Sequence, residues 1–166
     1  LGNHDARMIE HPQATWGITR GNPIWEEIHE AALQAGPAFL LNVTLNRDQR
    51  ITGIFAGDMR VAHEAGTRFV RDSAMIGVDG PFDIVITTNS GYPLDQNLYQ
   101  AVKGMSAAAQ IVRPGGAIIA AAACSDGLPD HGLYGELLRG AASPAALLET
   151  IRAYDEPRQD QWQAQI

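Results

Sequence analysis

The chain has 166 residues, 45% hydrophobic and 19% charged, a balance that excludes wholesale disorder and fits one domain or two small lobes. Twelve basic and nineteen acidic residues give a net charge of −7, so we expect neither nucleic acid nor an anionic membrane as a partner. One cysteine excludes an intrachain disulfide and a Cys-rich zinc site. No apolar run approaches the roughly 20 residues that span a bilayer. No signal-peptide pattern opens the chain, and we expect a cytoplasmic protein.

The first half of the chain predicts a helix, a β-hairpin and a second helix. Asn22 is a suitable N-cap for a helix that begins at Pro23, and Gly36 ends it. Two β-rich stretches joined by a polar turn follow, and Asp58 can cap the next helix. The expected elements are a loop over 1–23, the helix from 23, strands over 39–46 and 51–56, and a helix over about 59–73.

The second half begins at a break, Asp79-Gly80-Pro81, which is the best candidate for a lobe boundary. A nearly continuous apolar stretch over 82–88 is typical of a strand buried on both faces of a parallel sheet. We expect a helix over about 95–112, a turn over 113–116 and a second buried strand over 117–124, with further helices over 133–139 and 144–154. The prediction is an α/β fold, in which a small, mostly parallel sheet with a βαβ unit is flanked by helices and preceded by a β-hairpin and helix.

Two polar loops follow the two apolar strands, where ligands usually bind in open α/β sheets. The first, 87–97, carries Asp95 and leads into a helix N-terminus, which suits an anion. The second, 125–131, carries Ser125, Asp126 and His131. Ordinary solvated turns with capping residues have the same composition, and the sequence pattern leaves both interpretations open.

The helix after the first loop carries a polar stripe. Gln96, Gln100 and Lys103 recur at spacings of four and three and so share one face. Lys103 is the only lysine in the chain. The ammonium of a lysine attracts a carboxylate by its charge, and the amide of a glutamine orients it through a directed hydrogen bond. The two residues together can therefore hold a carboxylate. The alternative is a surface helix with an exposed polar stripe, which is the more common outcome.

Histidine and tryptophan give weaker signals. The five histidines form no His-x-x-x-His pair, and we interpret His29 and His63, inside predicted helices, as surface or packing residues. His131 lies near two aspartates and could be an acid or base, although a capped turn explains it equally well. The three tryptophans are spread out and predict no stacking platform.

Residues 82–86 and 112–119 resemble the late motifs of class I methyltransferases. Those enzymes also need a glycine-rich loop after their first strand, and residues 55–58 are a poor substitute for it. A methyltransferase-like domain is therefore the third interpretation.

A longer segment, residues 91–105, resembles the hallmark of the C-terminal lobe in the nickel-pincer lactate racemase family. Residues 21–23, 55–58 and 161–165 agree with the same family in the same order. The resemblance implies that residues 1–79 are the C-terminal tail of the family's N-terminal catalytic lobe and that residues 80–166 are the C-terminal α/β lobe. We also expect a fragment, because the chain starts without an initiator methionine and ends on an amphipathic run.

The resemblance implies part of a racemase or epimerase that interconverts the stereoisomers of a lactate-like 2-hydroxy acid. The family uses a nickel-pincer nucleotide, which is linked to a lysine and capped by a histidine. A hydride leaves C2 of the substrate and returns on the other face, while two histidines move the hydroxyl proton.

Four residues receive roles from the resemblance. Gln100 and Lys103 match the substrate-holding pair, which implies that they bind the carboxylate and act catalytically as charge develops. Tyr99 matches an active-site tyrosine and would contact the cofactor. His4 follows Asn3 as in the family's nickel-ligating Asn-His pair, which implies a metal ligand. Trp162 matches a family tryptophan, to which we assign no chemistry.

The cofactor-anchoring lysine and both acid–base histidines would lie upstream of Leu1. We therefore expect this chain alone to be inactive and to hold no nickel-pincer nucleotide. The expected partners are a small 2-hydroxy acid, the rest of the parent chain and a second copy of this chain, because a separated lobe exposes apolar surface. The competing function class is a non-catalytic α/β module that binds a small-molecule anion.

Overall fold

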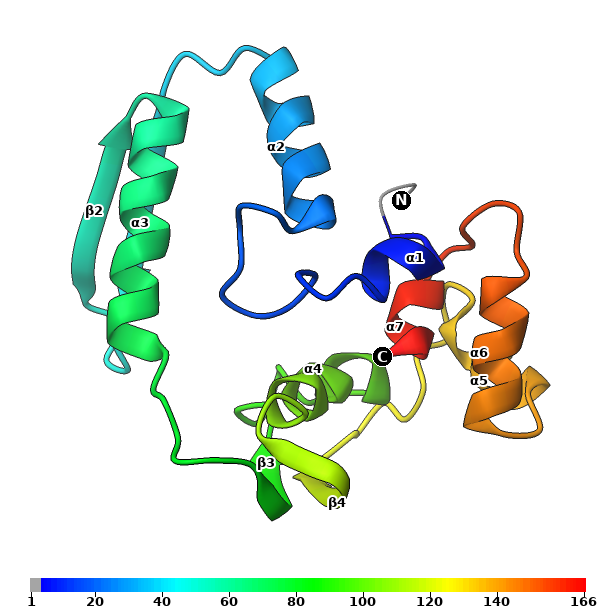
Figure 1. Ribbon diagram of the computed structural model, residues 1–166. Coiled ribbons are helices and arrows are strands. Elements are labelled where there is room, and N and C mark those ends of the chain that lie inside the picture. Colours follow the sequence, from blue (N-terminus) through cyan, green and yellow to red (C-terminus); the bar gives the residue numbers. More distant parts are fainter. Residues whose placement is uncertain (1–3) are drawn as a thin grey trace. The chain divides into compact units, whose positions relative to one another are not determined.

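The computed structural model describes residues 4–166, and the chain divides into two compact units. The larger unit joins Leu1–Trp16 to Val78–Ile166, and the smaller unit is Gly17–Gly77. Both mix helices with a two-stranded sheet, so the predicted α/β class is confirmed (Figure 1). Across residues 4–166, no helix has the length and apolar character needed to cross a membrane.

The smaller unit has the order that the sequence predicts. Asn22 and Asp58 cap its two helices by accepting backbone N–H groups of the first turn, because a free carboxamide or carboxylate oxygen satisfies donors that the helix leaves unpaired. An antiparallel hairpin lies between the helices in the chain. The elements are α2 (Pro23–Gln34), β1 (Leu40–Leu45), β2 (Ile51–Gly57) and α3 (Met59–Ala74).

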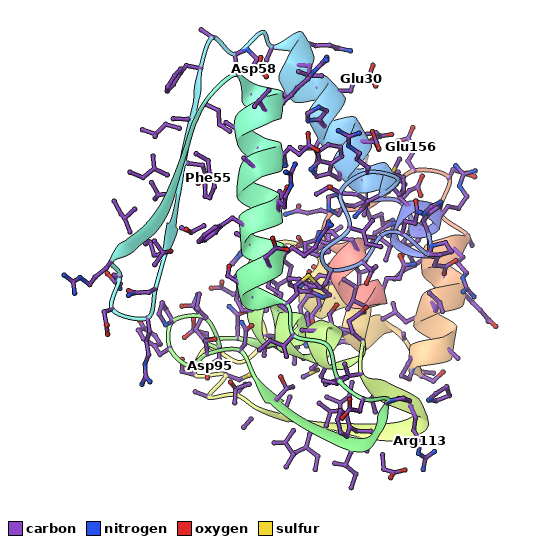
Figure 2. The ribbon with its side chains drawn as sticks, turned by 60° about the vertical axis from the view of Figure 1, so that its left-hand side comes forward. Glu30, Phe55, Asp58, Asp95, Arg113 and Glu156 are labelled. Atoms are coloured by element: carbon purple, nitrogen blue, oxygen red, sulfur yellow. The ribbon has the colours of Figure 1, made fainter. Side chains whose placement is uncertain are left out.

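Helix α3 packs on one face of the hairpin. The Phe55 side chain lies between β2 and α3, with its ring 5.5 Å from that of Phe69 (Figure 2). Because side chains alternate along a strand, Ile54 and its cross-strand partner Val43 lie on the opposite face, as does Leu41. These three side chains are exposed, so the hairpin presents an apolar face that α3 does not cover.

The larger unit contains the predicted βαβ unit. Strands β3 (Phe82–Thr88) and β4 (Val112–Ala121) pair in parallel and are connected through α4 (Leu98–Ala108). Helices α5 (Tyr134–Gly140) and α6 (Pro144–Arg152) follow. The terminal α7 (Gln161–Gln165) lies beside α1 (Ala6–Ile9), and Gln165 bonds the Ala6 carbonyl (Figure 1).

Three local predictions were wrong. Helix α4 begins at Leu98 rather than near Asp95, because Asn97 is its N-cap. Residues 113–116 belong to β4 rather than to a turn; Gly115 has a φ of 76°, and the pairing register shifts nearby, as in a bulge. Helix α1 falls in a segment predicted as loop, where Asp5 accepts the Met8 N–H at 2.8 Å.

Strand β3 is also less buried than predicted. Ile84 is 59% exposed and Ile86 is 74% exposed. Within residues 4–166 the sheet has only two strands, and α4 packs against it. Strand β3 therefore carries more apolar side chains than the other elements of this chain cover.

Candidate functional site

Helix α4 is held tightly against β3. A Cβ built on Gly104 would lie 2.6 Å from the Thr88 carbonyl oxygen, so only glycine allows this approach. The Thr87 hydroxyl donates to the Gly104 carbonyl at 3.3 Å, and Ala101 and Ala108 are buried on the same helix. This packing leaves Gln100 half-buried and Lys103 exposed on the helix.

Gln100 and Lys103 meet, as their spacing predicts. The Lys103 Nζ donates to the Gln100 Oε1 at 2.7 Å, and this contact leaves further N–H donors on the ammonium and on the Gln100 amide. Gln96, the third member of the predicted stripe, precedes the first helical residue and takes no part in this contact. The site is therefore a pair of residues rather than a stripe of three.

Three aromatic rings cluster at the start of α4. The Tyr99 ring lies 5.3 Å from Tyr134 and 6.0 Å from Trp162, both edge to face. Burial raises the pKa of the Tyr99 phenol and that of Tyr134 above their ordinary values. Both phenols therefore stay neutral and can donate a proton in a hydrogen bond.

His4 joins this cluster through Trp162, with ring centroids 5.2 Å apart. Burial lowers the pKa of His4, which keeps the imidazole neutral and able to ligate a metal. From His4 to the end of the chain, no group of three or more His, Cys, Asp or Glu side chains is arranged to hold a metal. The residues present fit one nitrogen ligand, and the remaining donors would have to come from a cofactor or from other parts of a longer protein.

The two polar loops are joined to each other. Asp95 is 6% exposed, and its Oδ2 accepts the Ala123 N–H at 2.9 Å. Three backbone bonds extend this contact: Cys124 N–H to the Asp95 carbonyl at 3.0 Å, Asp126 N–H to the Gln96 carbonyl at 2.8 Å and Leu98 N–H to the Gly127 carbonyl at 3.1 Å. The sequence singled out both loops, but not this pairing.

The remaining candidates in the second loop behave as turn residues. The His131 ring is 84% exposed and lies 3.4 Å from Asp130, its neighbour in the chain. The Ser125 hydroxyl bonds the adjacent Asp126 carboxylate at 3.3 Å. These contacts fit the capped-turn interpretation better than an acid–base role.

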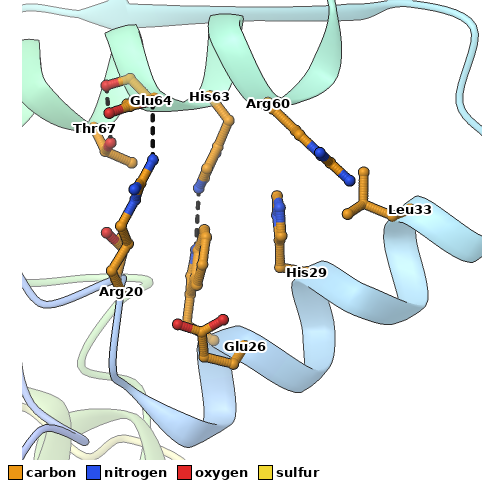
Figure 3. Close-up of a pocket in the computed structure, with 10 residues that line it drawn as sticks. Arg20, Glu26, His29, Leu33, Arg60, His63, Glu64 and Thr67 are labelled. Atoms are coloured by element: carbon orange, nitrogen blue, oxygen red, sulfur yellow. Dashed lines mark hydrogen bonds and ion pairs between the residues drawn. The ribbon is translucent and has the colours of Figure 1, made fainter.

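The smaller unit has a pocket of about 440 Å³ between α2 and α3 (Figure 3). Trp25 stacks on His29 at 4.4 Å and donates its indole N–H to the His63 Nε2 at 3.1 Å. Arg20 contacts Glu64 at 3.4 Å on the rim (Figure 3). Both histidines pack, as predicted. The ring contacts of Trp25 and Trp162 were missed, although His29 lies four residues after Trp25 in the same helix; the rings that Trp162 contacts come from other elements.

Comparisons with known proteins agree with the family resemblance. Residues 79–166 match the family model described as the lactate racemase C-terminal domain. The chain is 42% identical to a lactate racemase from Thermoanaerobacterium thermosaccharolyticum and 43% identical to one from Lactiplantibacillus plantarum, covering all of this chain and 39% of each relative. The structure of the lactate racemase apoprotein from the first organism matches with a TM-score of 0.92 at 41% identity, over 99% of this chain and 39% of that one.

The chain thus spans about two fifths of the length of the curated relatives that it matches. The family model covers more than half of the chain, and the matched region contains β3, α4, β4 and the Gln100–Lys103 pair. The chain therefore belongs to the lactate racemase family and carries its C-terminal domain.

Proposed function

We propose that the chain is part of a racemase or epimerase of a lactate-like 2-hydroxy acid and that it supplies the contacts to the substrate carboxylate. The 2.7 Å bond between Lys103 and Gln100 is the observation that supports this role, because it presents an ammonium and an amide side by side. Both lie on a helix that packs closely against β3 at Gly104, and the Thr87 hydroxyl bonds the Gly104 carbonyl.

In this proposal each member of the pair has a distinct task. Lys103 neutralises the carboxylate, and its position on α4 lets the same charge stabilise negative charge that builds up on the substrate during the reaction. The Gln100 amide donates a directed hydrogen bond, which limits rotation of the bound acid. Held in this way, the substrate presents C2 in one orientation.

Two further residues would face the nickel-pincer nucleotide. His4, with its neutral imidazole, would be a nickel ligand, and Tyr99 would pack against the cofactor through the aromatic cluster. When bound, the cofactor would supply a hydride acceptor for C2 of the hydroxy acid. The chain's own contribution is to hold the acid and, through the Tyr99 phenol, to offer a neutral hydrogen-bond donor.

We further propose that residues 1–79 are the tail of the N-terminal catalytic lobe and residues 80–166 the C-terminal lobe of a cytoplasmic enzyme. Lys103 is the only lysine, so the lysine that anchors the cofactor would lie elsewhere in the parent protein. The chain alone would then be inactive and would need the rest of the parent as a partner.

Replacing Lys103 by alanine in the full-length parent tests the proposal. We expect kcat/KM for lactate to fall by about 100- to 1000-fold, the usual loss when a charge-stabilising group is removed. Arg113→Ala is the matched control, because Arg113 is an exposed cation of the same unit that pairs with Asp83. Equal activities of the two variants would refute the proposal.

The competing function, a non-catalytic anion-binding module, uses the same Gln100–Lys103 contact. In that case Lys103→Ala in the parent would weaken binding of a small carboxylate, and the parent would show no racemisation before the substitution. Measuring the optical rotation of a lactate solution with the unmodified parent separates the two functions.

A further inference from the structure

We infer that Gln163 and Asn89 are positioning residues that hold the first turn of α4 in place, so that Gln100 and Lys103 meet the substrate carboxylate together. The inference rests on the function proposed above. The Gln163 Nε2 donates to the Tyr99 carbonyl at 2.6 Å, and the Asn89 Nδ2 donates to the Gln100 carbonyl at 3.0 Å. The two carbonyls are consecutive and belong to the first turn of α4, which carries Gln100 and precedes Lys103.

These bonds reach α4 from two different elements. Gln163 lies in α7, near the end of the chain, whereas Asn89 lies in the loop after β3. Asn89 also donates to the Leu94 carbonyl, which fixes its own amide within that loop. Bonds from two directions to successive carbonyls restrict both the shift and the rotation of the turn.

The acceptors are already in use within the helix. By the i to i−4 pattern, the Tyr99 carbonyl receives the backbone N–H of Lys103, and the Gln100 carbonyl receives that of Gly104. Each side-chain amide therefore shares its acceptor with the backbone near Lys103. A movement of the Gln163 amide therefore acts on the carbonyl bonded to Lys103, and a movement of the Asn89 amide acts on the backbone of Gln100 itself.

Gln163 is suited to this task because water does not compete for it. The residue is 1% exposed, and its Oε1 is buried without a hydrogen-bond donor among residues 4–166. Losing the bond to Tyr99 would leave both polar atoms of this buried amide unpaired, so the bond is costly to break.

Helix α7 also provides a matched control. Gln165 is the same residue type two positions later, its Oε1 is likewise buried without a donor, and its Nε2 bonds a backbone carbonyl at 3.1 Å. That carbonyl belongs to Ala6 in α1 rather than to α4. A comparison of variants of the two glutamines therefore separates the effect of the bond to α4 from the effect of disturbing the packing of α7 in general.

The experiment uses the full-length parent with Gln163→Met, Gln165→Met and Asn89→Ala, each alone and combined with Lys103→Ala. Methionine keeps the length of glutamine and removes the N–H donor. We expect Gln163→Met and Asn89→Ala to raise KM for lactate about tenfold with a smaller change in kcat, because a misplaced pair binds the carboxylate poorly. Gln165→Met should change KM less than twofold at a comparable loss of melting temperature.

Lactate binding measured by calorimetry then shows whether the effect passes through the pair. With Lys103→Ala already present, Gln163→Met and Asn89→Ala should each weaken binding by clearly less than they do alone, since only the Gln100 contact is left to be misplaced. The inference would be overturned if the losses of binding in the single variants added in full in the double variants, or if Gln165→Met raised KM as much as Gln163→Met. If Gln163→Met does not fold, Asn89→Ala decides by the same additivity test. Unchanged lactate binding in Lys103→Ala alone would instead refute the proposed function.

Discussion

The two units differ in what they bury. In the larger unit, α4, α5 and α6 contribute buried apolar side chains, and α7 adds two buried glutamines. In the smaller unit Ala62 is the one buried apolar residue among those that the structure describes, while both strands and α3 expose large apolar side chains. The larger unit thus has a core of its own, although β3 leaves Ile84 and Ile86 exposed, whereas the smaller unit consists largely of uncovered apolar faces.

This difference is sharpest for a matched pair of isoleucines. Ile151 in α6 is 1% exposed and Ile54 in β2 is 64% exposed. Ile151→Ala should lower the free energy of unfolding by about 2–5 kcal/mol, because it leaves a cavity, whereas Ile54→Ala should change it by less than about 0.5 kcal/mol. Urea denaturation of both variants tests the comparison, and similar losses would show that the smaller unit has a core after all.

The close approach of α4 to β3 gives the next effect. Gly104→Ala places a methyl group against the Thr88 carbonyl and should cost about 1–3 kcal/mol of stability. Gly140→Ala is the control, because nothing lies within 4 Å of a Cβ built there, and alanine favours a helix. Thermal unfolding of the two variants should move in opposite directions, and a stable Gly104→Ala would contradict the packing described for α4.

The uncovered face of the hairpin should govern self-association. If a second copy covers Leu41 and Ile54 when this chain is separated from its parent, replacing both by lysine adds charge to the contact and should weaken the dimer about tenfold or more. Sedimentation equilibrium of the chain and of the double variant measures this. A chain that sediments as a monomer before any substitution would contradict the predicted homodimer.

The smallest effect concerns alkaline pH. Because burial raises the pKa of Tyr99 and Tyr134, a spectrophotometric titration should show these phenols ionising at a higher pH than an ordinary tyrosine does. Between the ordinary tyrosine pKa of about 10 and the raised values, the folded state retains protons that the unfolded state has lost. Stability should therefore fall as pH rises through this window, and Tyr99→Phe should reduce that slope.

The sequence predicted the elements of the smaller unit well because their signals are local. Asn22, Asp58 and the polar turn between the strands each act on neighbouring backbone groups. The errors in the larger unit have non-local causes. Gly115 and Gly116 look like a turn, but they lie in a bulge between Val112 and Ala117, both of which pair with β3. A Cβ on Gly116 would lie 2.7 Å from the Asp83 carbonyl oxygen.

For the candidate site, too, contacts within one helix could be predicted from the sequence, and contacts between distant elements could not. Helical spacing correctly placed Gln100 beside Lys103, since both residues belong to one helix. The roles of Gln100, Lys103, Tyr99 and His4 stay predictions drawn from the resemblance. No sequence pattern could have related Gln163 to Tyr99, because 64 positions separate them and the bond depends on how α7 docks.

The joined loops after β3 and β4 provide a built-in reporter. Cys124 carries the one thiol of the chain. Its backbone N–H donates to the carbonyl of Asp95, which lies in the short segment that leads into α4. A fluorophore or spin label attached to its sulfur would therefore report a movement of this segment when an acid binds. Within this chain such a probe needs no engineered attachment point, because Cys124 is its one cysteine.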